Sequence, residues 1–162
     1  MHYIIDGNNF IGHSPDLSLT AEDCRRDALL RVAAFCRRAG ARATIFFDGG
    51  PDAHVGVSGV SLGPVRALLA GKGIEADTRI LALVDGGRGR VFTVVSSDRK
   101  IYGRARSAGC EALRVHEFNA LLERARRQDL ATEYRQAELD QKSRQLRDGE
   151  LKEWLEIFGE DS

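Results

Sequence analysis

The chain begins with a short apolar run that stops at an acidic residue. Residues 3–5 (Tyr-Ile-Ile) are aromatic or β-branched, and Asp6 follows them directly. Such a run predicts a strand that is buried on both faces of a sheet. In an open α/β sheet, ligands bind beyond the carboxyl ends of the strands, which is where Asp6 would stand. An Asx-turn or a helix cap is the alternative reading, because Asp and Asn are ordinary choices in both.

The same arrangement occurs twice more. Residues 43–47 (Ala-Thr-Ile-Phe-Phe) run into Asp48, and residues 91–95 (Val-Phe-Thr-Val-Val) are followed within three residues by Asp98. Asp77 is a fourth acid, in the first turn of an expected helix, where the helix dipole alone also explains an acid. If the strands are parallel, these acids gather at one edge of the sheet and repel one another unless a cation lies among them. Oxygen ligands without nearby His or Cys favour Mg²⁺ or Mn²⁺ over zinc.

Strand and helix patterns alternate along the first 122 residues. Strands are expected at residues 3–5, 43–47, 65–69, 91–95 and 110–115. This alternation predicts a three-layer α/β/α, Rossmann-like fold with a mostly parallel five-stranded sheet. Between the first two strands we expect a helix with Thr20 as its N-cap and Gly40 at its end. Residues 49–64, rich in Gly, Pro and Ser, predict a loop or a small hairpin.

The chain changes character after residue 122. Residues 123–162 hold 8 basic and 11 acidic residues with sparse apolar ones, which predicts a charged helical C-terminal extension. We expect a break near Asp148 and Gly149 that divides the extension into two helices. Its apolar end should pack on the domain or on a partner, through Trp154, Leu155 and Phe158.

The composition limits the classes of protein that remain. Lys plus Arg equals Asp plus Glu at 24 each, so no global field draws the chain to nucleic acid or membrane. Three cysteines without metal spacing argue against a disulfide framework or a zinc site. No apolar run approaches the roughly 20 residues that span a bilayer, and no signal segment is evident. We therefore expect a soluble cytoplasmic protein.

Any anionic partner must then meet local basic residues. The candidates for phosphate contacts are Lys72, in a loop, and the residues that follow Asp98 on an expected helix, Arg99, Lys100 and Arg104. A solvated surface lysine is the alternative for Lys72. Ser96 and Ser97 could hydrogen-bond a metal ligand or a phosphate, or could cap the next helix.

Several motifs resemble those of the YacP-like branch of NYN domains, within the PIN-like nucleases. IIDGNNFIG is similar to the family's Asp-Gly-Tyr-Asn opening, with Asn9 matching its asparagine and Asn8 replacing its tyrosine. Three further motifs and the last strand and helix follow in the family's order, namely FFDG, EADTRI, VVSSDRKI and GCEALRVHEFNALL. The resemblance covers residues 2–122, which implies a nuclease domain over 1–122 and an extension over 123–162.

The resemblance implies a divalent-metal-dependent ribonuclease with Asp6, Asp77 and Asp98 as its catalytic, metal-binding acids. Asn9 would be a supporting polar residue, and Asp48 matches a family position of open role. The branch commonly carries Glu-Thr-Ala-Asp where this chain has Ile-Glu-Ala-Asp at residues 74–77, so the role of Glu75 is also open.

The expected activity is endonucleolytic hydrolysis of RNA by a water molecule that Mg²⁺ or Mn²⁺ activates. We expect single-stranded RNA, with mRNA or ribosome-associated RNA as candidates and the ribosome as a candidate partner that presents the substrate. A non-catalytic RNA-binding or ribosome-associated module of the same fold is the main alternative. A scaffold that acts through the helical extension is another. A phosphatase would place a second aspartate where this chain has Asn8.

Overall fold

The computed structural model describes residues 1–20, 23–50, 59–87 and 91–159. The chain divides into two compact units, residues 1–123 and 124–162. Within the described residues the elements follow in the order β1 (His2–Asp6), α1 (Gly7–Gly12), α2 (Cys24–Ala39), β2 (Arg42–Phe47), β3 (Gly59–Leu62), β4 (Val65–Leu69), α3 (Ala76–Asp85), β5 (Thr93–Val95), α4 (Arg99–Ser107), β6 (Glu111–Leu113) and α5 (Val115–Phe158).

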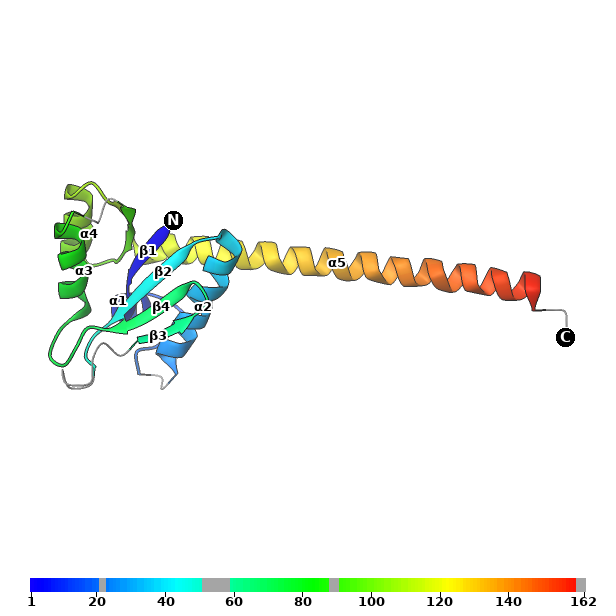
Figure 1. Cartoon of the computed structure of the whole chain (residues 1–162), viewed down its shortest axis with the longest axis horizontal. Coiled ribbons are helices and arrows are strands. Elements are labelled where there is room, and N and C mark those ends of the chain that lie inside the picture. Colours follow the sequence, from blue (N-terminus) through cyan, green and yellow to red (C-terminus); the bar gives the residue numbers. More distant parts are fainter. Residues whose placement is uncertain (21–22, 51–58, 88–90, 160–162) are drawn as a thin grey trace. The chain divides into compact units, whose positions relative to one another are not determined.

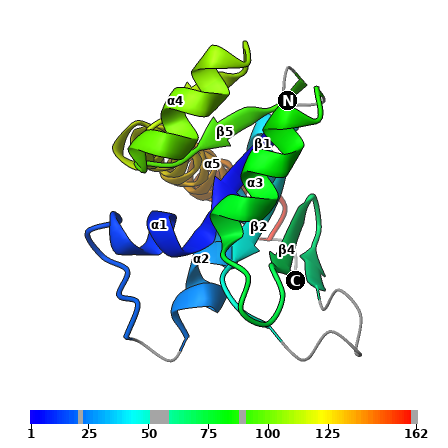
Figure 2. The ribbon, with the colours of Figure 1, turned by 90° about the vertical axis from the view of Figure 1, so that its left-hand side faces the viewer.

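One sheet organises the first unit. Its strand order among the described residues is β3-β4-β2-β1-β5-β6, and every pairing is parallel except that of β3 with β4. The five predicted strands correspond to β1, β2, β4, β5 and β6. The expected count of five is wrong, because β3 adds a sixth, antiparallel strand at the edge. Figure 2, viewed from the side of α3 and α4, shows β1 between β2 and β5.

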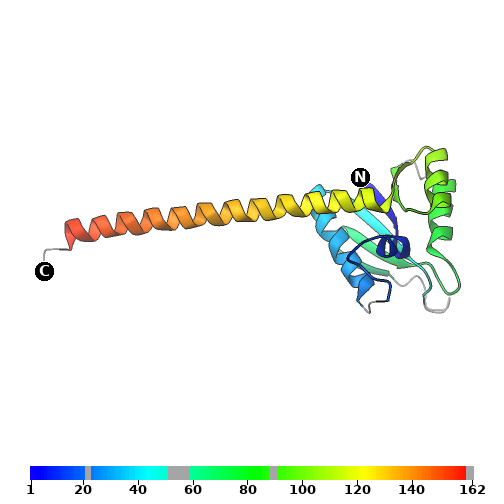
Figure 3. The same ribbon diagram turned by 180° about the vertical axis from the view of Figure 1, so that it is seen from behind.

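Helices cover both faces of this sheet, as expected for a three-layer fold. Side chains alternate along β1, so Tyr3 and Ile5 pack in one core with α1, α2 and the start of α5. Ile4 packs in the other core, with α3 and α4. Figure 1 shows α2 and α3 on opposite sides of the strands, and Figure 3 gives the view from behind. The burial of β1 on both faces therefore follows from its uninterrupted apolar run.

The β3–β4 hairpin lies in the segment for which a loop or a hairpin was expected. Residues 59–62 pair with residues 65–68 across a turn in which Gly63 adopts a positive φ of 56°. Residues 51–58, which belong to the same expected loop, lie outside the described residues. The hairpin alternative is confirmed for the described part.

The N-cap predicted for the first long helix is wrong. α2 begins at Cys24, Asp23 occupies the cap position, and the Asp23 side chain makes no capping hydrogen bond. Cys24 is also the first buried residue of the helix, so α2 begins where its buried stripe begins. The expected end is confirmed, because Gly40 adopts the left-handed conformation at the C-cap.

The break predicted at Asp148 and Gly149 is also wrong. α5 runs without interruption from Val115 to Phe158. A glycine inside a helix costs only about 1 kcal/mol relative to alanine, and strong helix formers flank this one. No helix among the described residues is both long enough and apolar enough to cross a membrane.

Candidate active site

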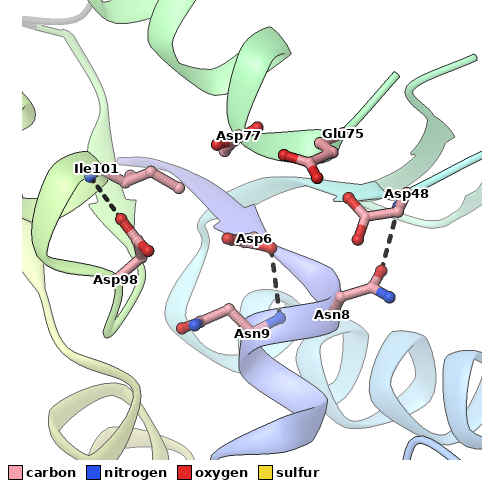
Figure 4. Close-up of a pocket in the computed structure, with 8 residues that line it drawn as sticks. All are labelled: Asp6, Asn8, Asn9, Asp48, Glu75, Asp77, Asp98 and Ile101. Atoms are coloured by element: carbon pink, nitrogen blue, oxygen red, sulfur yellow. Dashed lines mark hydrogen bonds between the residues drawn. The ribbon is translucent and has the colours of Figure 1, made fainter. Parts of the chain in front are cut away.

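The strand order creates a crevice at the carboxyl end of β1. The chain proceeds from β1 to β2 on one side and later places β5 on the other side, which is the arrangement that forms binding crevices in open α/β sheets. A pocket of about 250 Å³ opens there. Its described lining consists of Asp6, Asn8, Asn9, Asp48, Glu75, Asp77, Asp98 and Ile101 (Figure 4). The four acids predicted from the sequence therefore face one cavity.

Asp6 lies at the centre of this pocket. It is the last residue of β1 and the N-cap of α1, and its Oδ1 accepts the backbone N–H of Asn9 at 3.3 Å. Only 8% of the residue is exposed. The pKa of Asp6 is raised to about 6, mainly by burial and in smaller part by the carboxylates of Asp48, Asp77 and Asp98, while the Asn9 hydrogen bond acts in the opposite direction. The capping alternative is therefore confirmed for Asp6, which also lines the pocket.

Asp48 ties two elements of the pocket together. Its Oδ1 accepts the N–H of Ala76, the first residue of α3, at 2.6 Å. Its own backbone N–H donates to Oδ1 of Asn8 at 3.1 Å. Asp48 thus joins the end of β2 to the start of α3 on one side and to α1 on the other.

The start of α3 contributes two more carboxylates. Asp77 lies in the first turn and accepts a hydrogen bond from the Thr78 hydroxyl at 3.4 Å. Glu75 occupies the N-cap position without a side-chain capping bond. In Figure 4 both carboxylates lie on the opposite side of Asp6 from the asparagines of α1.

Asp98 lies on the β5 side of Asp6 and caps α4. Its Oδ1 accepts the N–H groups of Lys100 at 2.8 Å and Ile101 at 3.0 Å. The residue is exposed on the pocket rim. One oxygen of Asp98 therefore accepts from both helix donors, and the other oxygen makes no hydrogen bond with a described residue.

Asn9 and Ser96 position the loop that carries Asp98. Oδ1 of Asn9 accepts the N–H of Ser97 at 2.7 Å and the hydroxyl of Ser96 at 3.4 Å. The hydroxyl oxygen of Ser96, which is fully buried, accepts the N–H of Asp98 at 3.1 Å. Oγ of Ser97 accepts the N–H of Val115 at the start of α5. The two serines therefore support the acid-bearing loop, and neither is among the described lining residues.

A family model for YacP-like NYN domains matches residues 3–159 of the chain. The chain belongs to this family. Its members are PIN-like nuclease domains. The match extends through most of α5, so the family pattern includes the charged helical segment.

Two solved structures share the fold of this NYN protein. Both are crystal structures of Rae1 (YacP) from Bacillus subtilis. One is 22% identical with a TM-score of 0.67 and covers 99% of this chain and 96% of its own. The other, a single-residue variant, is 23% identical with a TM-score of 0.64 and covers 78% of this chain and 77% of its own. No curated protein matches the chain.

The basic residues expected to meet RNA lie outside the pocket of this NYN domain. Arg99 and Lys100 are exposed in the first turn of α4, and Lys72 is exposed in the turn after β4. Arg104 is held in a salt bridge of 2.6 Å with Asp85. A neighbouring acid therefore offsets the charge of Arg104.

Sequence reasoning did not single out Asn8 as a site residue, and it left Glu75 open. Both line the pocket. Asn8 lies in a short helix, α1, and its amide oxygen accepts the backbone N–H of Asp48. The adjacency of Asn8 to Asp6 was the available signal, whereas the position of Glu75 depends on the contact between Asp48 and Ala76.

The donor set fits Mg²⁺ or Mn²⁺. The described lining offers five carboxylates and two amides but no His or Cys, and no described salt bridge neutralises these acids. Among the described residues, however, no three acidic, histidine or cysteine side chains are already arranged around one point. Mg²⁺ commonly takes one or two protein carboxylates and keeps several water ligands, so a wide acidic pocket suits it.

Proposed function

We propose that this protein is a divalent-metal-dependent endoribonuclease that hydrolyses RNA phosphodiester bonds. The observation that carries the proposal is the convergence of five carboxylates on one crevice whose described lining includes no basic side chain. In a family of nuclease domains, such a crevice is suited to a divalent cation and to the phosphate that the cation attracts.

Asp6, Asp77 and Asp98 are the residues proposed to hold the cation. When bound, Mg²⁺ or Mn²⁺ lowers the pKa of water and offsets negative charge on the phosphate under attack. Asp6 supplies a carboxylate at the centre of the pocket, and a bound cation would offset its repulsion with Asp48, Asp77 and Asp98. Asp98 keeps one oxygen available because its other oxygen caps α4.

The remaining polar residues keep these acids in place. Asn9 and Ser96 hold the loop of Asp98, and Asp48 holds the start of α3 and thereby Asp77. Such fixed supports matter because small displacements of catalytic groups cost large factors in rate.

Single-stranded RNA is the proposed substrate, with mRNA or ribosome-associated RNA as its source. Sequence-specific recognition of RNA mostly targets unpaired segments, whose bases and phosphates can approach a protein rim. The acids lie at the carboxyl ends of the strands in an open crevice, which a flexible RNA strand can enter.

The test is cleavage of a labelled single-stranded RNA by the purified protein with Mn²⁺ or Mg²⁺, and with a chelator. We expect metal-dependent cleavage by the wild type and at least a hundredfold loss in Asp6→Asn and Asp98→Asn, since removing a group that stabilises transition-state charge costs about this factor. Asp27→Asn, an exposed acid of α2, is the matched control and should cleave normally.

Two results would contradict the proposal. If Asp6→Asn cleaves RNA at the wild-type rate, the acid pocket is not the site of cleavage. RNA binding without cleavage under any divalent metal would instead favour the non-catalytic module.

A further inference from the structure

Two arginines contact loops that carry pocket acids, and each is held in the same way. Each guanidinium stacks on an aromatic ring and also donates to the backbone carbonyl of a loop that carries a pocket acid. The two are Arg25 and Arg114. Neither is among the described residues that line the pocket.

Arg25 lies on the β2 side. It belongs to the first turn of α2, and its guanidinium carbon is 5.1 Å from the centre of the Phe47 ring. Its Nη2 donates to the carbonyl oxygen of Asp48 at 3.3 Å. Phe47 is 3% exposed, so the ring is a fixed support for the exposed guanidinium.

Arg114 lies on the β5 and β6 side. Its guanidinium carbon is 4.2 Å from the centre of the Tyr102 ring, and its Nη1 donates to the carbonyl oxygen of Ser97 at 3.4 Å. Glu117 accepts the backbone N–H of Arg114 at 2.7 Å and makes no described salt bridge with the guanidinium. Most of the five guanidinium donors are left for a ligand.

The sheet order puts these groups on opposite sides of Asp6. β1 carries Asp6 and lies between β2, which leads to Asp48, and β5, which leads to Ser97. Neighbouring strands are about 4.8 Å apart, so β2 and β5 are separated by roughly 10 Å. A chain of phosphates that crosses the strand ends would meet one arginine before the acids and the other after them.

Both guanidiniums retain their charge for a partner. No salt bridge between described residues involves Arg25 or Arg114. By contrast, Arg26, the neighbour of Arg25, lies 3.4 Å from a carboxylate oxygen of Asp23. Arg104 lies 2.6 Å from Asp85. Planar guanidiniums that are preorganised in this way bind phosphate with little loss of side-chain entropy.

We propose that Arg25 and Arg114 bind backbone phosphates of single-stranded RNA on either side of the phosphate in the acid pocket, so that the strand crosses the carboxyl ends of β2, β1 and β5. This inference rests on the proposed function for the location of the cleaved phosphate. The binding contacts themselves need no metal.

The experiment measures the affinity of the full chain for a short labelled single-stranded RNA, in chelator, as a function of salt concentration. The variants are Arg25→Gln, Arg114→Gln and the double variant. Each single variant should bind roughly tenfold more weakly at low salt, as expected for one lost charge-assisted contact. The slope of log affinity against log salt should fall by about 0.7 for each lost phosphate contact and about twice that in the double variant.

The matched controls are Arg26→Gln, next to Arg25 on α2, and Arg106→Gln, an exposed cation of the last turn of α4. Both should keep the wild-type slope and an affinity within about twofold. Arg25→Lys and Arg114→Lys retain a positive charge and should restore most of the slope, even where a Gln variant is less stable.

The outcomes separate this inference from the proposed function. Wild-type affinity and slope in Arg25→Gln and Arg114→Gln overturn the inference, as does weaker binding with an unchanged slope, which marks a purely structural role. A wild type that fails to bind RNA in chelator overturns it too. A wild type that binds RNA through both arginines but does not cleave it with any divalent metal supports the proposed RNA path and contradicts the endonuclease proposal.

Discussion

Asp6 is a buried carboxylate that the folded protein holds at a pKa of about 6, against 3.8 for the unperturbed group. Between these two values the folded protein keeps a proton that the unfolded chain has lost. The free energy of unfolding therefore falls as pH rises from about 4 to about 6, and the penalty persists above pH 6. A difference of roughly two pH units corresponds to about 3 kcal/mol.

Asp6→Asn should remove this penalty while keeping an oxygen that can accept the Asn9 N–H. In chelator at pH 7.5 we expect the variant to be more stable than the wild type by up to about 3 kcal/mol, and by little at pH 4. Urea denaturation at both pH values measures this. Asp27→Asn should show no such pH-dependent gain, and an equal gain at both pH values would contradict the electrostatic explanation.

Gly7, which follows β1 directly, matters for steric reasons. The residue starts α1 with a negative φ, and an added Cβ would lie 2.4 Å from the Phe47 ring and 2.9 Å from Ile45. Sequence rules identify a glycine near a strand end, whereas the ring that excludes a Cβ belongs to β2, some 40 residues away. Local sequence rules therefore could not predict the packing that requires a glycine at this position.

Gly7→Ala should destabilise the protein by about 1–3 kcal/mol, because overpacking forces Phe47 to move. Gly103→Ala is the matched control, since an added Cβ there meets no heavy atom within 4 Å and alanine favours the helix by up to about 1 kcal/mol. Urea denaturation of both variants gives the comparison. A neutral Gly7→Ala would show that β1 and β2 can separate at little cost.

At the scale of elements, the start of α3 depends on a side chain from another strand. Asp48 accepts the Ala76 N–H across 28 residues of sequence, and Glu75 at the N-cap position makes no side-chain capping bond. Local capping rules cannot detect such a partner. Local rules also predicted Thr20 as the N-cap of α2, whereas the helix begins at Cys24, its first buried residue.

Asp48→Ala should cost about 0.5–2 kcal/mol, the usual range for a lost helix cap, and should lower cleavage through the displacement of Asp77. Asp48→Asn keeps a capping oxygen and should retain stability near the wild-type value. If Asp48 acts by holding α3, cleavage by the Asn variant should exceed that by the Ala variant. Equal and complete losses in both variants would assign Asp48 a direct charge role instead.

At the scale of the whole molecule, the parallel sheet was predictable because its central strands, β1, β2 and β5, are built on largely apolar runs. β3 was left as one of two alternatives because its residues are mostly exposed at the sheet edge, and a weak alternation does not distinguish an edge strand from a loop. The convergence of Asp6, Asp48 and Asp98 followed from the parallel arrangement, since each acid ends a strand or follows one within three residues. The places of Asn8 and Glu75 in the pocket lining depend on contacts that form only in the folded protein.

The acid pocket should couple metal binding to the stability of the domain. A cation that binds only the folded state stabilises it by about 2.7 kcal/mol at a hundredfold excess over Kd, which raises Tm by roughly 5–10 °C in a chain of this size. Thermal unfolding with increasing Mn²⁺ should therefore raise Tm in the wild type and in Asp27→Asn, and far less in Asp6→Asn. Because Asp6→Asn should be the more stable protein in chelator, the order of the two Tm values should reverse as the excess of Mn²⁺ over Kd approaches a thousandfold, where the gain of the wild type is about 4.1 kcal/mol. Folding damage cannot produce such a crossing, and an equal gain in both proteins would place the ion outside this pocket.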